Sequence, residues 1–276
     1  MNAENAKAAS ELLAFYMDAG VDVLVGDEPV NRLDGAPPRA PAEKESPRET
    51  RSQAPSLLHV SRPIRAGEAR AATIAPPDAA MTAARQQATN AASLEALRAM
   101  LEQFEGCALK NTATQLVFAD GNPQARLMFV GEAPGREEDL AGLPFVGRSG
   151  QLLDRMLAAI GLDRTSVYIA NIVPWRPPGN RTPTPQETST CLPFIRRQIE
   201  LVDPDVLVSL GQPSMQGLLG VTDGILKTRG RWFVYHTGTR EIRAMATLHP
   251  AYLLRQPLQK RLAWRDFLAI KKALDG

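Results

Sequence analysis

Three residues whose side chains could do chemistry follow short apolar runs of the chain. Glu132 comes after the run 127–130, Asn171 lies near the end of the run 167–173, and His249 follows the run 242–248. The amide of asparagine offers a donor and an acceptor side by side, which matches the edge of a nucleobase. A carboxylate and an imidazole commonly move protons or stabilise charge. An asparagine can instead cap a turn, and a lone histidine is more often a packed structural residue.

The elements around these residues alternate between strand and helix from about residue 105 onward. We predict strands at 127–130, 167–173, 206–210 and 242–248, and helices at 92–104, 151–160, 185–202, 214–219 and 260–274. Strands separated by helices predict an α/β protein with a mostly parallel sheet and helices on both faces. Ligands of such sheets bind beyond the carboxyl ends of the strands, where the three candidate residues are expected.

The first 90 residues differ in composition from the rest of the chain. Residues 3–19 have apolar side chains at helical spacing, which predicts an N-terminal helix within 1–27. Residues 28–80 contain nine prolines and no aromatic residue. Such a segment cannot bury enough apolar surface to offset its ordering entropy. We therefore expect a disordered Pro/Ala/Arg-rich linker over 28–90 and one globular domain over 91–276.

Charge and cysteine content exclude several classes of protein. The net charge is +2, but residues 227–272 hold 11 Lys and Arg against two Asp and Glu, which could attract a polyanion or form a solvated basic face. No apolar run approaches the roughly 18–20 residues that a membrane span requires. Two cysteines, Cys107 and Cys191, exclude a disulfide scaffold and a four-cysteine zinc site. We expect a cytoplasmic protein without membrane contact.

The turns that follow the predicted strands are rich in glycine and proline. Gly131 and Gly135 bracket the first turn, where a flat ligand could approach the backbone closely, although the Gly-Lys-Ser/Thr ending of a phosphate loop is absent. The segment 176–181 is a rigid Arg/Pro loop that suits a phosphate clamp. The segment 249–255 places two leucines beside an arginine, which suits a loop that wedges between stacked bases.

Taken together, five motifs resemble those of the family 4 uracil-DNA glycosylases, within the wider uracil-DNA glycosylase superfamily. They are Gly-Glu-Ala-Pro-Gly (131–135), Pro-Phe-Val-Gly-Arg (144–148), Tyr-Ile-Ala-Asn (168–171), Arg-Pro-Pro-Gly-Asn-Arg (176–181) and His-Pro-Ala-Tyr-Leu-Leu-Arg (249–255). They occur in family order and cover roughly 104–274, whereas 1–95 is not explained by the resemblance. The resemblance implies a three-layer α/β/α sandwich around a four-stranded, mostly parallel sheet. It also implies hydrolysis of the bond between uracil and deoxyribose in DNA, which initiates base-excision repair.

The resemblance assigns a role to each motif residue. Phe145 would stack on uracil beside Gly131, Asn171 would read the edge of the base, and His249 would stabilise the departing uracil anion. Glu132 would position the water or stabilise the sugar cation, with the backbone as the alternative holder of the water. The DNA itself would be contacted by Arg176, Asn180, Arg181, Leu253, Leu254 and Arg255, with the two leucines filling the gap left by the extruded base.

The chemistry of uracil agrees with these assignments. The amide of Asn171 can accept a hydrogen bond from N3–H and donate one to O4, whereas cytosine presents the opposite pattern and would leave buried polar groups unsatisfied. Thymine differs only by a methyl group, so it must be excluded by shape near Gly135 or Glu138. Flipping the base out costs a few kcal/mol, and stacking on Phe145 returns roughly 1–3 kcal/mol. The implied partners are uracil-containing DNA and free uracil as product, for a monomer associated with the nucleoid when on DNA.

One departure from the family pattern concerns its cofactor. The resemblance implies a four-iron four-sulfur cluster held by four cysteines. Cys107 and Cys191 match two of these positions, while Phe104 and Trp175 occupy the other two. We therefore expect no cofactor and no metal, with the two aromatic residues filling the place of the cluster.

Two other classes of function remain as alternatives. A catalytically silent DNA-binding or polymerase-associated module could keep the same fold. A nucleotide-binding enzyme on a similar sheet is less favoured, because the glycine patterns of dinucleotide and phosphate loops are missing. Retention of Glu132, Asn171 and His249 together favours an active enzyme.

Overall fold

The computed structural model describes residues 77–276 of the chain. The predicted N-terminal helix within 1–27 and the part of the predicted linker from 28 to 76 lie outside the described residues. Within 77–276, no helix is long and apolar enough to cross a membrane.

A six-stranded mixed sheet forms the centre of the described part. Its strands are β1 (Asp120–Gly121), β2 (Leu127–Gly131), β3 (Tyr168–Asn171), β4 (Val206–Leu210), β5 (Trp232–His236) and β6 (Glu241–Thr247). They run in the order β1-β3-β2-β4-β6-β5, and the four inner strands are parallel. The α/β prediction is confirmed, but the expected count of four strands is wrong. The two additional strands are antiparallel edges: β1 has only two residues, and β5 is the first arm of a hairpin with β6.

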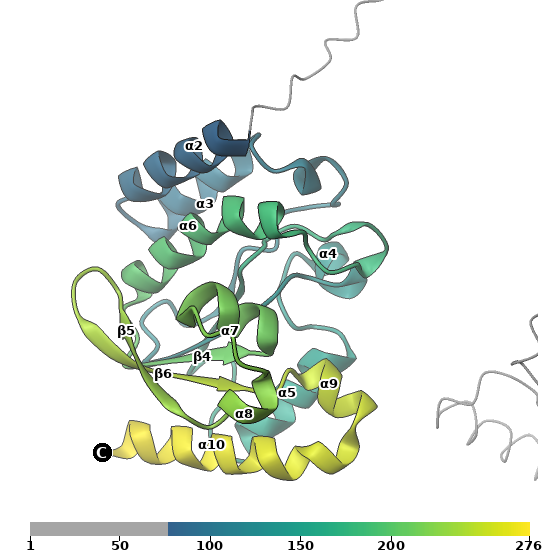
Figure 1. Cartoon of the computed structure of the whole chain (residues 1–276), viewed down its shortest axis with the longest axis vertical. Coiled ribbons are helices and arrows are strands. Elements are labelled where there is room, and N and C mark those ends of the chain that lie inside the picture. The colour runs from purple at the N-terminus through teal and green to yellow at the C-terminus, as the bar shows by residue number, and fades with distance from the viewer. Residues whose placement is uncertain (1–76) are drawn as a thin grey trace, which may run out of the picture. The chain divides into compact units, whose positions relative to one another are not determined.

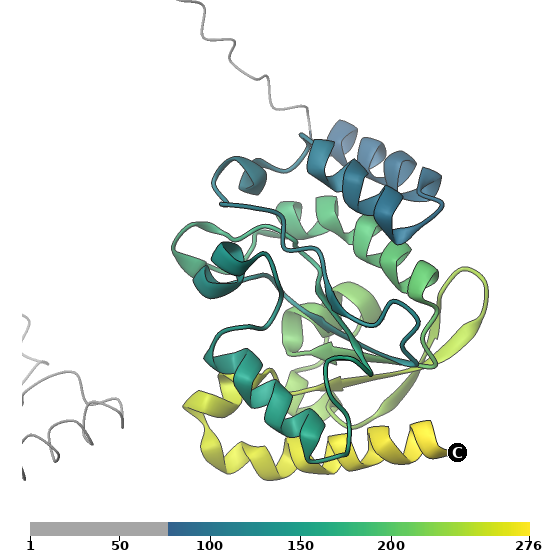
Figure 2. The same ribbon diagram turned by 180° about the vertical axis from the view of Figure 1, so that it is seen from behind.

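Helices cover both faces of this sheet, which gives three layers (Figure 1, Figure 2). One layer holds α2 (Pro77–Asn90), α3 (Leu94–Gln103), α6 (Pro185–Val202) and α7 (Gln212–Leu219). The other holds α5 (Arg148–Ala158) and α10 (Lys260–Asp275). The segments that connect these strands and helices contain three short helices, α4 (Arg136–Ala141), α8 (Ile225–Thr228) and α9 (Pro250–Arg255). They also contain three 3₁₀ turns, η1 (Ala108–Asn111), η2 (Pro178–Asn180) and η3 (Pro257–Gln259).

Helix α2 corrects the predicted extent of the linker, because 77–90 is helical rather than disordered. Alanine has the highest helix propensity, and Ala80, Ala84 and Ala88 recur every four residues along one face. All three are buried, and α2 packs along α6 (Figure 1). The composition of this segment is poor in large apolar side chains, but small side chains let two helices approach closely, so little apolar volume is needed.

Side chains of the inner strands alternate between the two layers, as the period of two requires. In β2, Met128 and Val130 pack in the core on the α2, α3 and α6 side. Leu127 and Phe129 pack on the α5 and α10 side, where the ring of Phe129 stacks on that of Phe267 with centroids 5.8 Å apart. The sheet is therefore packed on both faces.

The register of the parallel strands brings distant motifs to the same edge of the sheet. Gly131 at the end of β2 is paired with Asn171 at the end of β3. Leu210 at the end of β4 is paired with Thr247 at the end of β6, two residues before His249. The candidate residues of three motifs consequently lie at the carboxyl ends of parallel strands of one sheet, as predicted.

Candidate active site

Gly131 lies against two of the candidate side chains and leaves no room for one of its own. A Cβ atom at this position would be 2.4 Å from Oδ1 of Asn171 and 2.7 Å from the ring of Phe145. Asn171 and Phe145 are 5% and 4% exposed. Gly131, Phe145 and Asn171, three of the predicted uracil-binding residues, therefore lie together. Their close contact is possible because Gly131 has no side chain.

Phe145 is held in an unusual backbone conformation. Its φ is 55°, in the left-handed region that bulky residues rarely adopt. The buried carboxylate of Glu138 braces the surrounding loop, because Oε1 accepts hydrogen bonds from the backbone N–H groups of Val146 and Gly147, at 3.1 and 3.0 Å. Its Oε2 accepts a third, from Gly135 at 3.0 Å. One carboxylate thus ties the first turn to the loop that carries the aromatic ring.

His249 adjoins this group and caps α9. Its ring centroid is 5.4 Å from that of Phe145, and its Nδ1 accepts a hydrogen bond from the backbone N–H of Ala251 at 3.1 Å. Since Nδ1 is an acceptor, the proton of the neutral imidazole is on Nε2, which is left as a donor. Burial, with a further contribution from the positive charge of Arg255, lowers the pKa of His249 to about 4. The imidazole is therefore neutral at physiological pH.

Glu132 and His249 line one cavity of about 410 Å³ at the same edge of the sheet. Asn171 and Phe145 are not among the residues that line this cavity; both lie against Gly131, and Phe145 also adjoins His249. Burial raises the pKa of Glu132. Among residues 77–276, buried side-chain oxygens without a hydrogen-bond partner occur at Glu132 (Oε1), Asn171 (Oδ1) and Ser209 (Oγ). Two of the three thus belong to the predicted site, and an unpaired buried acceptor is costly unless a ligand satisfies it.

The predicted DNA-binding residues divide into two groups. Asn180 and Arg255 line the same cavity as Glu132. Arg176 donates from Nε to Oδ1 of Asn180 at 2.6 Å, which orders the loop after β3. Arg181 instead donates to both carboxylate oxygens of Glu187, at 2.8 and 2.7 Å, so its guanidinium is already engaged at the start of α6.

The two leucines of the last motif have different environments, and this corrects one prediction. Leu253 is fully buried and packs with Leu248 and Ala263, so it is a core residue rather than a wedge. Leu254 is 36% exposed. Adjacent residues of a helix point in directions about 100° apart, which places only one of the pair toward solvent.

The residues at the expected cluster position do not fit a four-cysteine site. The thiol of Cys191 lies 3.9 Å from the sulfur of Cys107, and both residues are buried. Phe104 and Trp175 are each 2% exposed, and the ring of Phe104 packs edge-on against that of Phe194 at 5.0 Å. Within the described residues, no group of three or more His, Cys, Asp or Glu could hold a metal ion. Two thiols beside packed aromatic rings supply half of the four ligands that the cluster needs.

Residues outside the motifs also line the site. Gln212 and Ile225 line the cavity of Glu132 and His249, and neither was singled out by sequence reasoning. Gln212 lies two residues after the end of β4, so its position after a parallel strand was the available signal.

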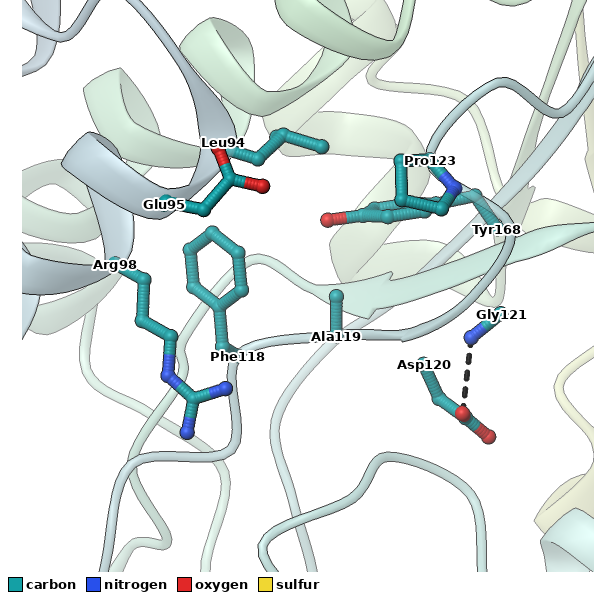
Figure 3. Close-up of a pocket in the computed structure, with 9 residues that line it drawn as sticks. All are labelled: Leu94, Glu95, Arg98, Phe118, Ala119, Asp120, Gly121, Pro123 and Tyr168. Carbon is teal, nitrogen blue, oxygen red and sulfur yellow. Dashed lines mark hydrogen bonds between the residues drawn. The ribbon is translucent and has the colours of Figure 1, made fainter.

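A separate cavity of about 200 Å³ lies at the amino end of β3, between α3 and β1 (Figure 3). Its wall includes Glu95, Phe118, Asp120 and Tyr168, and it contains none of the predicted site residues. It is therefore distinct from the candidate active site.

Comparison with known proteins agrees with the geometry. The sequence model of the family described as the uracil DNA glycosylase superfamily matches residues 118–268. A type-4 uracil-DNA glycosylase of Archaeoglobus fulgidus is 41% identical over 168 residues, which cover 59% of this chain and 84% of the relative. That of Thermotoga maritima is 42% identical over 163 residues, which cover 59% and 83%. The family match spans more than half of the sequence and holds every predicted site residue, and the chain belongs to the uracil-DNA glycosylase superfamily.

Proposed function

We propose that this protein is a uracil-DNA glycosylase, which flips uracil out of DNA and hydrolyses its N-glycosidic bond. The observation that carries the proposal is the buried, unpaired Oδ1 of Asn171 beside the ring of Phe145 and the imidazole of His249. An aromatic face, an amide edge and a neutral imidazole donor are what recognition of a flat pyrimidine requires.

Uracil is selected by the pattern of its hydrogen-bonding groups. Oδ1 of Asn171 accepts from N3–H of the base while its amide nitrogen donates to O4. Cytosine has an acceptor at N3 and a donor at position 4, so it would leave both groups unpaired in a buried site, at a cost of roughly 1–3 kcal/mol each. The ring of Phe145 stacks on the base and compensates for the stacking lost on flipping.

Bond cleavage leaves negative charge on the departing uracil and positive charge on the sugar, and the site has one group to stabilise each charge. As the bond between N1 and C1′ breaks, the electron pair leaves with uracil, and Nε2–H of His249 donates a hydrogen bond to O2. A donor in a buried site stabilises such an anion far better than one in water. Water then attacks C1′, its oxygen stays on the sugar, and its proton passes to solvent or to the departing base. The carboxylate of Glu132 stabilises the sugar cation or positions this water.

DNA is held around the mouth of the site. Arg255 and Asn180 line the cavity and are suited to phosphates, with Arg176 ordering the loop of Asn180. Leu254 is exposed on α9 and is suited to fill the gap left in the base stack. The product is free uracil. We further propose that the protein acts as a monomer in the cytoplasm, associated with the nucleoid when on DNA.

We also propose that the enzyme works without an iron–sulfur cluster. The support is the packing of Phe104 and Trp175 at the positions of two expected ligands. Iron analysis and the visible spectrum of freshly purified protein test the proposal. We expect substoichiometric iron and no broad visible absorption, and one cluster's worth of iron per chain would refute it.

The activity is tested with a labelled duplex that carries one uracil, followed by alkali to cut abasic sites. We expect cleavage at uracil alone, and its loss in Asn171→Ala. Arg126→Gln is the matched control, because Arg126 forms an ion pair with Asp205 at the opposite end of β2. No cleavage by the wild type, with salt-sensitive binding to DNA retained, would instead support the silent DNA-binding module.

A further inference from the structure

A half-buried cluster of ion pairs contacts the loop that carries Phe145. Arg164, in the segment between α5 and β3, donates from Nε to Oδ1 of Asp154 at 2.8 Å and from Nη1 to Oδ2 of Asp120 at 2.6 Å. The carboxylate of Asp120 also accepts a hydrogen bond from the backbone N–H of Gly121 at 2.9 Å (Figure 3). The guanidinium is therefore anchored on helix α5 and on the edge strand β1.

The remaining donors of Arg164 point at the backbone of the uracil-stacking loop. Nη1 donates to the carbonyl oxygen of Pro144 at 3.1 Å, and Nη2 donates to that of Phe145. A Cβ atom added to Gly150, in the first turn of α5, would be 1.6 Å from the oxygen of Phe145. The carbonyl therefore lies close to both the first turn of α5 and the guanidinium.

This arrangement has a specific consequence for Phe145. A residue with φ of 55° stores strain that the surroundings must offset. The two hydrogen bonds from Arg164 act on the carbonyls of Pro144 and Phe145, which are the peptide groups on either side of the strained Cα. Without them, the loop is free to return to an ordinary conformation, and the ring would leave the position beside Gly131 and His249.

We infer that Arg164 is a positioning residue for base recognition, which sets the stacking face of Phe145 by holding the backbone of residues 144 and 145. It does not touch the base. The inference rests on the proposed function, because Arg164 would act by positioning Phe145 to stack on uracil.

A double-mutant cycle separates this role from a general contribution to folding. In the wild-type background, Arg164→Gln should lower kcat/KM for uracil excision by about 10- to 100-fold, because displacing a recognition group by about 1 Å costs rates of that order. The inhibition constant of free uracil should rise in parallel. In a Phe145→Ala background, the same substitution should change kcat/KM by less than about threefold, since the ring that it positions is gone.

Arg164→Lys provides a second variant that keeps the positive charge beside Asp120 and Asp154. A single ammonium group cannot reach both carboxylates and both carbonyls, so we expect the same loss as for Arg164→Gln. Arg126→Gln, which removes the arginine paired with the carboxylate of Asp205, is the control and should leave kcat/KM unchanged. All variants are compared below their thermal unfolding transitions.

Equal losses with and without the Phe145 ring would show that Arg164 acts on stability or on another part of the site, and would overturn the inference. Wild-type activity from either arginine variant would overturn it as well. A wild-type protein that excises no uracil would instead overturn the proposed function, so the two failures are distinguishable.

Discussion

Gly131→Ala adds a single methyl group where the backbone of Gly131 lies against Asn171 and Phe145. The new Cβ would lie 2.4 Å from Oδ1 of Asn171 and within 2.9 Å of two ring atoms of Phe145. Ordinary contacts of this kind begin at 3.4 Å. The amide oxygen would therefore have to retreat by about 1 Å, and the ring by about half as much or more.

The expected effect follows from this displacement. Both groups that contact uracil would be misplaced together, and a 1 Å error in a positioned group costs about 100-fold in rate. At about 1.4 kcal/mol per tenfold, this corresponds to about 3 kcal/mol of lost transition-state stabilisation. Overpacking also costs about 1–3 kcal/mol of stability, which should lower the melting temperature by several degrees in a protein of this size.

The assay is single-turnover excision of uracil from a labelled duplex, at a temperature where circular dichroism shows the variant folded. Gly224→Ala is the matched control, since an added Cβ there meets nothing within 4 Å and its φ is −65°. We expect Gly224→Ala to retain wild-type activity. If Gly131→Ala stayed within threefold of Gly224→Ala, the reasoning that Gly131, Asn171 and Phe145 form one contact surface would be refuted.

Three further predictions concern individual side chains. Asn171→Asp should lower uracil excision at least 100-fold, because a carboxylate cannot donate to O4; unchanged kcat/KM would contradict the proposed readout. Leu254→Ala should reduce excision from duplex DNA about tenfold with little effect on stability, whereas Leu253→Ala should cost about 2–5 kcal/mol of unfolding free energy in a urea titration; the reverse pattern would show that the buried residue is the wedge. The pKa of His249 is about 4 in the folded protein against 6.5 as its ordinary value, so the unfolded chain takes up its proton first as the pH falls. Stability should decrease from pH 6.5 to 4, by up to about 3 kcal/mol from this group, and His249→Asn should remove that part of the decrease in pH-dependent urea melts.

Much of the fold follows from local patterns that the sequence displays directly. The apolar run 206–210 and the amphipathic segment 185–202 form β4 and α6 with the predicted bounds. Their periodicities are local properties, so they are visible without knowledge of the fold. The edge strand β1 is too short to form a pattern, and α2 has mostly alanine on its buried face. Both depend on the neighbours that they pair with or pack against.

The sequence by itself determined which chemistry is available, because the motifs hold an amide, an imidazole, a carboxylate and an aromatic ring at the ends of parallel strands. It could not determine which of two adjacent leucines faces solvent, or that Arg181 is engaged by Glu187. It also could not show that Arg164, 19 residues away, donates a hydrogen bond to the backbone carbonyl of Phe145. Those facts arise from contacts between distant segments. Only the packed structure fixes the distances on which hydrogen bonds and burial depend.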